Sequence, residues 1–233
     1  MDAKRIIPVL EVCNGRIAAA GSAHPAEWAV SLEREGADGI IFRETVEAGP
    51  GPLAPPRAGW VRDVAGALSI PFALEAAFHG LEDLEAVLEA GADRVLLRPA
   101  MISAPTLAGA ARTFGRAHLG VVLRADLTPE NGWRMVLAGG PGERDAQAWM
   151  AEMEQWGASE ILLEAGPEGA AIGTLFQGAA RLALSVLYQC AGESGRVADA
   201  LLNGADGVAF PAGTRSPEQW KSLLRPHGLT LRD

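Results

Sequence analysis

The sequence predicts an α/β protein that folds as a single (β/α)8 TIM barrel with a two-fold half-barrel repeat. A Gly-Ala-Asp or Gly-Ala-Ser joint occurs four times along the chain, each time before an apolar segment. Apolar, strand-like segments alternate with helical patterns from one end of the sequence to the other. Both signals recur at about half the chain length. We therefore expect two similar half-barrels over residues 1–233, with no linker and no second domain.

The four joints have a direct physical explanation. Glycine ends a helix in the left-handed C-cap conformation, a tight turn follows, and a fully buried parallel strand then begins. The joints lie in EREGADGIIFRE (33–44), EAGADRVLLRP (89–99), EQWGASEILLEAG (154–166) and LNGADGVAFPAG (202–213). Each of these segments predicts one helix-to-strand connection of the barrel.

Further apolar segments bring the expected number of strands to eight. They are IIPVLE (6–11), IPFALEA (70–76), LGVVLRAD (119–126) and LALSVLYQ (182–189). The expected helices lie near residues 25–35, 58–68, 81–90, 104–114, 143–156, 173–181, 193–203 and 216–225. Ser103, Glu143 and Ser216 stand where N-caps or first-turn acids belong. We also expect a turn at Asn14-Gly15, a loop over 48–59 and a hairpin tip over 138–143.

The composition excludes several classes of function. A net charge of −9 disfavours nucleic acid, which needs a basic face, and it disfavours an anionic membrane surface. No apolar run is long enough for a signal peptide or a membrane span, so we expect a soluble cytoplasmic protein. Cys13 and Cys190 are too few for a disulfide framework. The four histidines have no metal-ligand spacing, and we expect no metal and no cofactor.

The carboxyl ends of the predicted strands carry the residues that matter for chemistry, because barrel active sites lie there. Five strands end in or near a carboxylate, namely Glu11, Glu44, Glu75, Asp126 and Glu164. Glu11 and Asp126 stand on opposite strands, so they are the candidates for a general acid and a general base. A small-molecule ligand is expected between them.

An alternative interpretation of this acidic rim is structural. Some of the carboxylates, Glu44 and Glu164 above all, would alternate outward into the layer between strands and helices. There they would pair with Arg43, Arg98 or Arg124 and take no part in chemistry.

The whole chain resembles a known family. KRIIPVLEVCNGR (4–16) is similar to the opening strand of the cyclase subunit of imidazole glycerol phosphate synthase. The segments GADGIIFRE, GADRVLLR, TFGRAHLGVVLRAD, WGASEILLEAG, NGADGVAF and HGLTLR follow that family in order and spacing. The resemblance implies a divergent paralogue in the histidine-biosynthesis lineage. It also implies a lyase that closes an imidazole ring, with ammonia delivered through the barrel from a glutaminase partner.

The resemblance assigns the acid–base work to two positions. The family has aspartates at the ends of strands 1 and 5, where this sequence has Glu11 and Asp126. Glutamate carries its carboxyl group about 1.5 Å further out, one bond length. A misplacement of about 1 Å can cost on the order of 10²-fold in rate.

The largest departures from the family concern phosphate. The family is expected to bind a bisphosphate through backbone amides in glycine-rich turns after strands 3, 4, 7 and 8. This sequence has Glu75-Ala76-Ala77, Arg98-Pro99, Gln189-Cys190-Ala191-Gly192 and Pro211-Ala212-Gly213 at those turns. Arg98 could still hold one phosphate with its side chain. The candidate substrate-binding residues are Arg98, Glu44, Glu75, Glu164, Gly192 and Gly213.

The opposite end of the barrel matches the family better. The resemblance implies a ring of charged residues at the ammonia entrance and a face that docks the glutaminase. Arg5, Arg94 and Glu160 fall on the ring, Gly39 lacks its charged group, and Asp93 falls on the docking face. The alternative is that these charges only stabilise the base of the barrel.

Three functions are therefore open. The first is the cyclase/lyase itself. The second is a non-catalytic scaffold or regulator that docks a glutaminase-type partner. The third is a repurposed barrel whose acidic rim binds a cationic small molecule or a metal ion.

Overall fold

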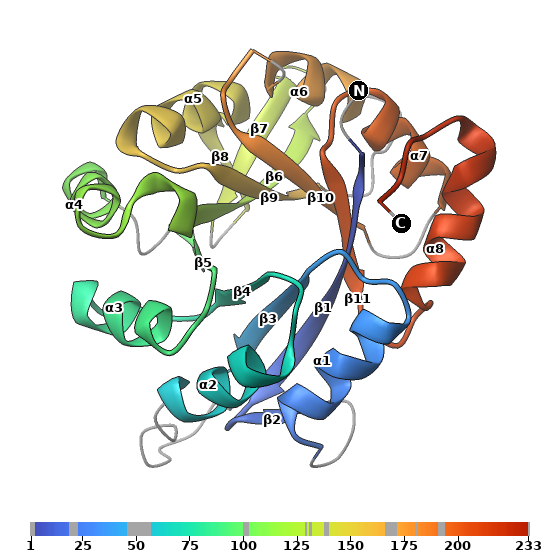
Figure 1. Cartoon of the computed structure of the whole chain (residues 1–233). Helices are drawn as coiled ribbons and strands as arrows, with labels where there is room; N and C mark the ends of the chain where they lie inside the picture. Colours follow the sequence, from blue (N-terminus) through green and yellow to red (C-terminus); the bar gives the residue numbers. More distant parts are fainter. Residues whose placement is uncertain are drawn as a thin grey trace.

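A computed structural model of the chain describes residues 3–18, 23–45, 57–99, 103–128, 130, 132–137, 140–165, 172–179, 181–190 and 194–232 (Figure 1). Eight parallel strands within these residues form a closed ring, as predicted. They are β1 (Arg5–Cys13), β3 (Ile40–Thr45), β4 (Phe72–Glu75), β5 (Arg94–Leu97), β6 (Leu119–Thr128), β9 (Glu160–Ala165), β10 (Ser185–Gln189) and β11 (Gly207–Pro211). The order is β5-β4-β3-β1-β11-β10-β9-β6, and pairing of β5 with β6 closes the ring. The carboxyl ends of these strands are called the mouth of the barrel below, and their amino ends the base.

Helices surround the ring on the outside (Figure 1). They are α1 (Pro25–Arg34), α2 (Arg57–Ala67), α3 (Leu81–Glu89), α4 (Ala104–Phe114), α5 (Ala146–Trp156), α6 (Ile172–Ala179), α7 (Ser194–Leu202) and α8 (Pro217–Leu224). Short 3-10 turns cover Arg116–His118 and Arg225–His227. Most of the expected loop over 48–59 lies outside the described residues. Among the described residues, every helix is too short or too polar to span a bilayer.

Two predicted helix caps are confirmed and one is wrong. Ser103 accepts a hydrogen bond from the backbone N–H of Thr106, and Ser216 forms a capping box with Gln219. Glu143 does not begin a helix, because residues Gly140–Asp145 form strand β8. The N-cap of α5 is Asp145, whose carboxylate accepts from the N–H of Ala148 at 2.9 Å.

The glycine of each repeated joint adopts the expected left-handed conformation. The φ angles are +89° at Gly36, +110° at Gly91, +110° at Gly157 and +125° at Gly204. A side chain would be strained in this conformation, so glycine is required. The alanine that follows each glycine is buried against the core.

The aspartate of the joint has a role that the helix-capping argument did not include. Asp38, Asp93 and Asp206 each accept a hydrogen bond, at 2.7–2.9 Å, from a backbone N–H of the neighbouring strand that precedes them in the chain. Each joint therefore fixes the height of one strand against its neighbour. Asp38 also pairs with the buried ammonium of Lys221 at 3.0 Å, which attaches α8 to the first joint.

Hairpins follow the equivalent strands β1 and β6 in the two halves of the barrel. β1 turns at Asn14-Gly15, with φ of +51° and +74°, and pairs with β2 (Arg16–Ile17). This confirms the predicted turn, which has the two-residue sequence favoured by tight hairpins. β6 pairs with β7 (Gly132–Leu137), which pairs in turn with β8 (Gly140–Asp145). The expected hairpin tip over 138–143 is too long, because residues 140–143 belong to β8, and residues 138 and 139 lie outside the described residues.

The core consists of two layers separated by the strands. The smaller cluster fills the barrel and consists of Ile7, Val9, Ile41, Ala73, Leu96, Val122, Leu162, Leu187 and Ala209. The larger cluster lies between strands and helices and includes Leu10, Phe42 and Leu123. Because side chains alternate along a strand, this division also tells which charged residues point toward the barrel axis.

Candidate functional site

Charged side chains form the layer of the barrel interior nearest the mouth. These residues share the inward strand face with the inner cluster: Glu11, Arg43, Glu75, Arg98, Arg124, Asp126, Glu164 and Gln189. Glu44 differs, because it shares the outward face of β3 with Phe42. The structure therefore brings Glu11, Glu75, Asp126, Glu164 and Arg98 to one rim and places Glu44 in the strand–helix layer.

Arg43 is the centre of this layer. Its Nε donates to Glu75 Oε2 on the adjacent strand β4 at 2.7 Å. Its Nη2 donates to Glu164 Oε1 on β9 at 2.8 Å and to Gln189 Oε1 on β10 at 2.7 Å. β9 lies on the opposite side of the ring from β3. The guanidinium of Arg43 thus spans the mouth and occupies its middle.

Glu75 is almost fully buried, with 2% of the residue exposed. A charge at this depth needs ion pairs and hydrogen bonds to offset its lost hydration. Arg43 contacts one carboxylate oxygen, and Arg98 contacts the other. Arg98 also lies 3.8 Å from Glu164. Two arginines and two glutamates from four strands therefore form one network, here called the mouth network: Arg43, Arg98, Glu75 and Glu164.

The two predicted acid–base residues stand outside the mouth network. Glu11 is exposed and makes no hydrogen bond or ion pair with any described residue. Asp126 has one buried carboxylate oxygen, Oδ1, without a hydrogen-bond partner. Glu11 borders a pocket of about 190 Å³ whose other walls include Arg43, Gln189, Pro211 and Trp28. This pocket lies at the mouth, beside Arg43 of the mouth network.

The other predicted substrate residues are less informative. Gly192 lies outside the described residues. Gly213 follows β11 with φ of +88°, and its α-carbon faces open space. Within the described part of the chain, no group of three or more His, Cys, Asp or Glu side chains is arranged to hold a metal ion.

A second charged cluster lies inside the base of the barrel. Glu160 is also 2% exposed and accepts from Arg5 at 2.8 Å and from Arg94 at 2.6 Å. Arg5 donates in addition to the hydroxyl of Ser185 at 2.6 Å. Asp93 lies nearby at the start of β5, where it holds the N–H of Phe72. Three of the four predicted partner-face residues therefore form one network, here called the base network: Arg5, Arg94 and Glu160.

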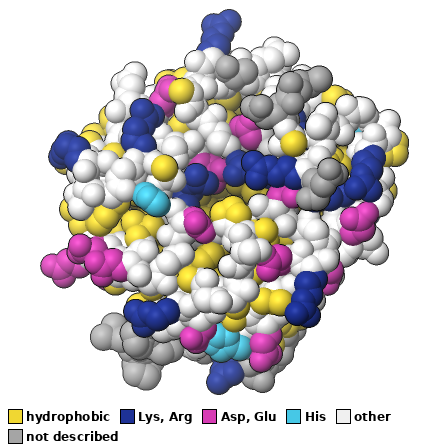
Figure 2. Space-filling model, viewed as in Figure 1, with side chains coloured by type: hydrophobic (Ala, Val, Ile, Leu, Met, Phe, Trp, Pro, Cys, Tyr) yellow, Lys and Arg dark blue, Asp and Glu magenta, His cyan; other side chains and the backbone are white. Residues whose placement is uncertain are grey.

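The surface agrees with this mixture of charges. On the face drawn in Figure 2, basic and acidic side chains lie beside one another near the middle of the molecule. They do not separate into large patches of one sign. This arrangement fits short-range pairing better than long-range attraction of a strongly charged partner.

Gln189 and Ser185 accept hydrogen bonds from Arg43 and Arg5, and the sequence did not predict either as a site residue. The sequence places Gln189 at a strand end and in a turn that differs from the family, and it assigns no role to Ser185. Both lie on β10, an even number of residues apart, so their side chains share its inward face. That period would have placed them inside the barrel, although it could not have identified Arg43 and Arg5 as their partners.

Comparison with known proteins agrees with this architecture. Residues 5–187 match the model of the family described as histidine biosynthesis protein. Imidazole glycerol phosphate synthase subunit HisF of Bacteroides fragilis is 30% identical over the full length of both chains. The HisF subunit of Halalkalibacterium halodurans is 34% identical over 174 residues, which are 70% of this chain and 68% of that protein. The chain therefore belongs to the histidine biosynthesis protein family, as a divergent HisF-like (β/α)8 barrel.

Proposed function

We propose that this protein is a cyclase-subunit-like barrel of the imidazole glycerol phosphate synthase type that no longer turns over the bisphosphate substrate. Its remaining role is that of a scaffold or regulator that docks a glutaminase-type partner. The observation that carries the proposal is the position of Arg43, held between Glu75, Glu164 and Gln189 across the mouth. The protein's own ion pairs occupy the middle of the mouth and leave a pocket of about 190 Å³ beside them.

The mouth network opposes a bisphosphate in two ways. Glu75 stands where the resemblance places a phosphate-binding glycine, and a buried carboxylate repels phosphate. A ligand that displaced Arg43 would also weaken the pairing of Glu75. Removing a partner from a buried ion pair costs about 3–5 kcal/mol. Binding of the substrate would have to offset that cost before any chemistry began.

The base network supports the docking role. Arg5, Arg94 and Glu160 match the charged ring that the resemblance places at the ammonia entrance, and they are ordered by mutual ion pairs. Preorganised charges lose little conformational freedom when a partner binds. The named HisF relatives are subunits of a synthase, so a partner subunit fits the lineage.

A second candidate is the cyclase/lyase itself. The exposed carboxylate of Glu11 and the unpartnered Oδ1 of Asp126 favour it, because free carboxyl groups are what acid–base catalysis requires. The third candidate, a cation site on the acidic rim, gains no such support. Glu75 and Glu164 are ion-paired with arginine, and Glu44 lies on the outward face.

The proposal is tested by mixing the purified chain with the glutaminase subunit of the synthase from the same organism. Complex formation is measured by sedimentation, and ring closure is measured with excess ammonium so that it does not depend on the glutaminase. We expect a complex and no product above the protein-free background. Product that disappears in Glu11→Gln and Asp126→Asn would establish the cyclase instead. Absence of a complex would remove the docking role.

A further inference from the structure

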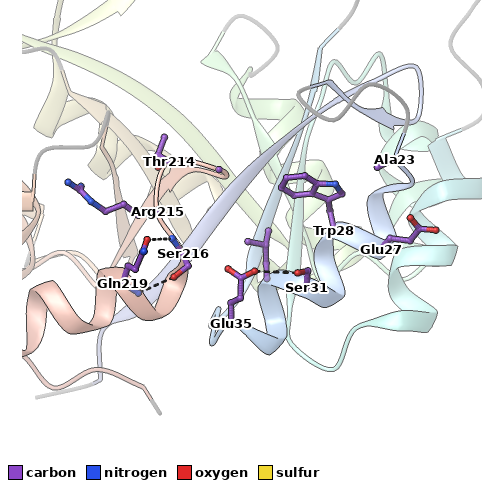
Figure 3. Close-up of a pocket in the computed structure, with 11 residues that line it drawn as sticks. Ala23, Glu27, Trp28, Ser31, Glu35, Thr214, Arg215, Ser216 and Gln219 are labelled. Carbon is purple, nitrogen blue, oxygen red and sulfur yellow. Dashed lines mark hydrogen bonds between the residues drawn. The ribbon is translucent and has the colours of Figure 1, made fainter.

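A pocket of about 500 Å³ lies between α1 and α8, to one side of the mouth (Figure 3). One wall is a face of α1 that carries Trp28, Ser31, Leu32 and Glu35. The other wall is the turn 213–216 after β11, together with Gln219 of α8. Figure 3 shows the indole of Trp28 over the gap, with Ser216 and Gln219 on the opposite side. A pocket of this volume is large enough for a small organic molecule.

The α8 wall does not offer a site for an anion. The side chains of Ser216 and Gln219 satisfy each other's backbone N–H groups in the capping box. Pro217 has no N–H to donate, and Glu218 places a negative charge in the first turn. The hydroxyl of Thr214 donates to the carbonyl of Pro211 at 2.8 Å. The donors that usually bind phosphate at a helix N-terminus are therefore absent or already engaged here.

The α1 wall carries negative charge that no described residue neutralises. Glu27 and Glu35 both line the pocket, and neither forms an ion pair with a residue that the structure describes. The hydroxyl of Ser31 donates to Glu35 at 3.3 Å, which leaves the carboxylate charged. Arg215 is the one basic residue among the described lining residues, and its guanidinium lies 5.1 Å from the centre of the Trp220 ring. The charged side chains that line the pocket therefore have a net negative charge.

Trp28 gives the pocket a second, independent feature. An indole face attracts a cation as well as an apolar body, more strongly than other aromatic rings do. Leu32 beside it is buried and extends the apolar floor. Trp28 also lines the smaller pocket next to Glu11, so the two cavities share this side chain as a wall.

We propose that the pocket between α1 and α8 binds an organic ammonium ion with an apolar or aromatic body. The body lies on Trp28 and Leu32, and the ammonium group faces Glu35. Glu27, two turns earlier on α1, adds negative charge at the other end of this wall. This site includes Gly213 of the turn after β11, and none of its lining residues belongs to the mouth network or the base network. The proposed amine site does not depend on the cyclase role or on the docking role.

Three probes that share one body test the chemistry of the site: phenethylamine, 2-phenylethanol and phenylacetate. Each is titrated into the full chain by ligand-observed NMR in phosphate-free buffer at low ionic strength. We expect saturable binding of the amine at millimolar concentration or below, at least tenfold weaker binding of the alcohol, and no saturation by the carboxylate. Equal binding of amine and carboxylate would overturn the proposal, as would absence of saturation by the amine at 10 mM, on the order of the weakest specific affinities.

Variants locate the site. Glu35→Gln should weaken amine binding several-fold and Glu27→Gln should weaken it less, whereas Glu85→Gln on the exposed face of α3 should leave it unchanged. Trp28→Ala should weaken it about tenfold, which lies between the values of an exposed and a desolvated cation–π contact. Trp28→Phe keeps an aromatic ring and should retain most of the binding. It serves as the test of this position if the alanine variant does not fold. Unchanged binding in the Glu27→Gln/Glu35→Gln double variant would place the amine elsewhere and overturn the assignment.

Discussion

The two ends of the barrel use the same device. At the mouth, buried Glu75 is held by Arg43 and Arg98, and at the base, buried Glu160 is held by Arg5 and Arg94. Both glutamates are 2% exposed. In each case two arginines compensate one carboxylate that has been withdrawn from water. The ends differ in where the arginines reach.

At the base, glycines let the strands and the inward side chains pack closely. A Cβ atom at Gly120 would lie 2.5 Å from the side chain of Leu96 and 3.3 Å from that of Arg94, and one at Gly207 would lie 2.7 Å from the backbone carbonyl of Arg5 and 2.9 Å from its Cβ. The base network therefore fits into a layer built for it. At the mouth, Arg43 crosses to the opposite strands and takes the space where a substrate would sit. Arginine–glutamate ion pairs therefore stabilise the strands at the base, whereas at the mouth they occupy the space in the middle of the barrel.

The largest expected effect comes from breaking the mouth network. Arg43→Ala leaves Glu75 buried with Arg98 alone and leaves Gln189 without its donor. We expect a loss of about 3 kcal/mol in the free energy of unfolding, the lower end for breaking a buried pair. Denaturant unfolding measures it. Arg124→Ala is the matched control, because Arg124 is exposed at the mouth and pairs with no described residue. Equal losses in both variants would contradict the special position of Arg43.

A smaller effect is expected from the base network. Glu160→Gln keeps the shape of the side chain and removes the charge that orders Arg5 and Arg94. Both arginines are partly exposed and can regain water, so we expect a loss of about 2 kcal/mol. The docking proposal adds that the complex with the glutaminase-type partner should weaken in parallel. Glu152→Gln, which disturbs only an exposed pair with Arg144, should change neither quantity.

The smallest effect on stability is expected at Glu11. It is exposed and has no partner among the described residues, so Glu11→Gln should change the free energy of unfolding by less than about 0.5 kcal/mol. Thermal or denaturant unfolding checks this. A loss of 2 kcal/mol or more would mean that Glu11 belongs to the structural network of the mouth and is not a spare catalytic group.

Local patterns predicted the barrel well because its repeated features are short-range. The glycines of the joints predict the helix ends, and the apolar runs after them predict the strands. The start of α5 was placed too early because Glu143 and Asp145 are both acidic residues shortly before a helical pattern. Only the pairing of β8 with β7 decides between them.

The sequence predicts which residues lie at the mouth, but not which of them form ion pairs with one another. The alternation of side chains places Arg43 and Glu164 inside the barrel, and their pairing was one of two open interpretations. Their contact joins residues 121 positions apart on opposite strands. No local rule selects that partner over Glu11, which lies opposite Arg43 in the register of β1 and β3. The choice depends on side-chain length and on burial of Glu75, which only the closed barrel determines.

The most direct test of the account is calorimetric titration with the bisphosphate substrate of the synthase in phosphate-free buffer. The wild-type chain is compared with an Arg43→Leu/Glu75→Gly variant, which removes the crossing side chain and the buried carboxylate together. We expect no saturable heat for the wild type at millimolar substrate, and stronger binding by the variant, because its mouth is open. Micromolar binding by the wild type, about −8 kcal/mol, would contradict it and make the cyclase reaction the leading function.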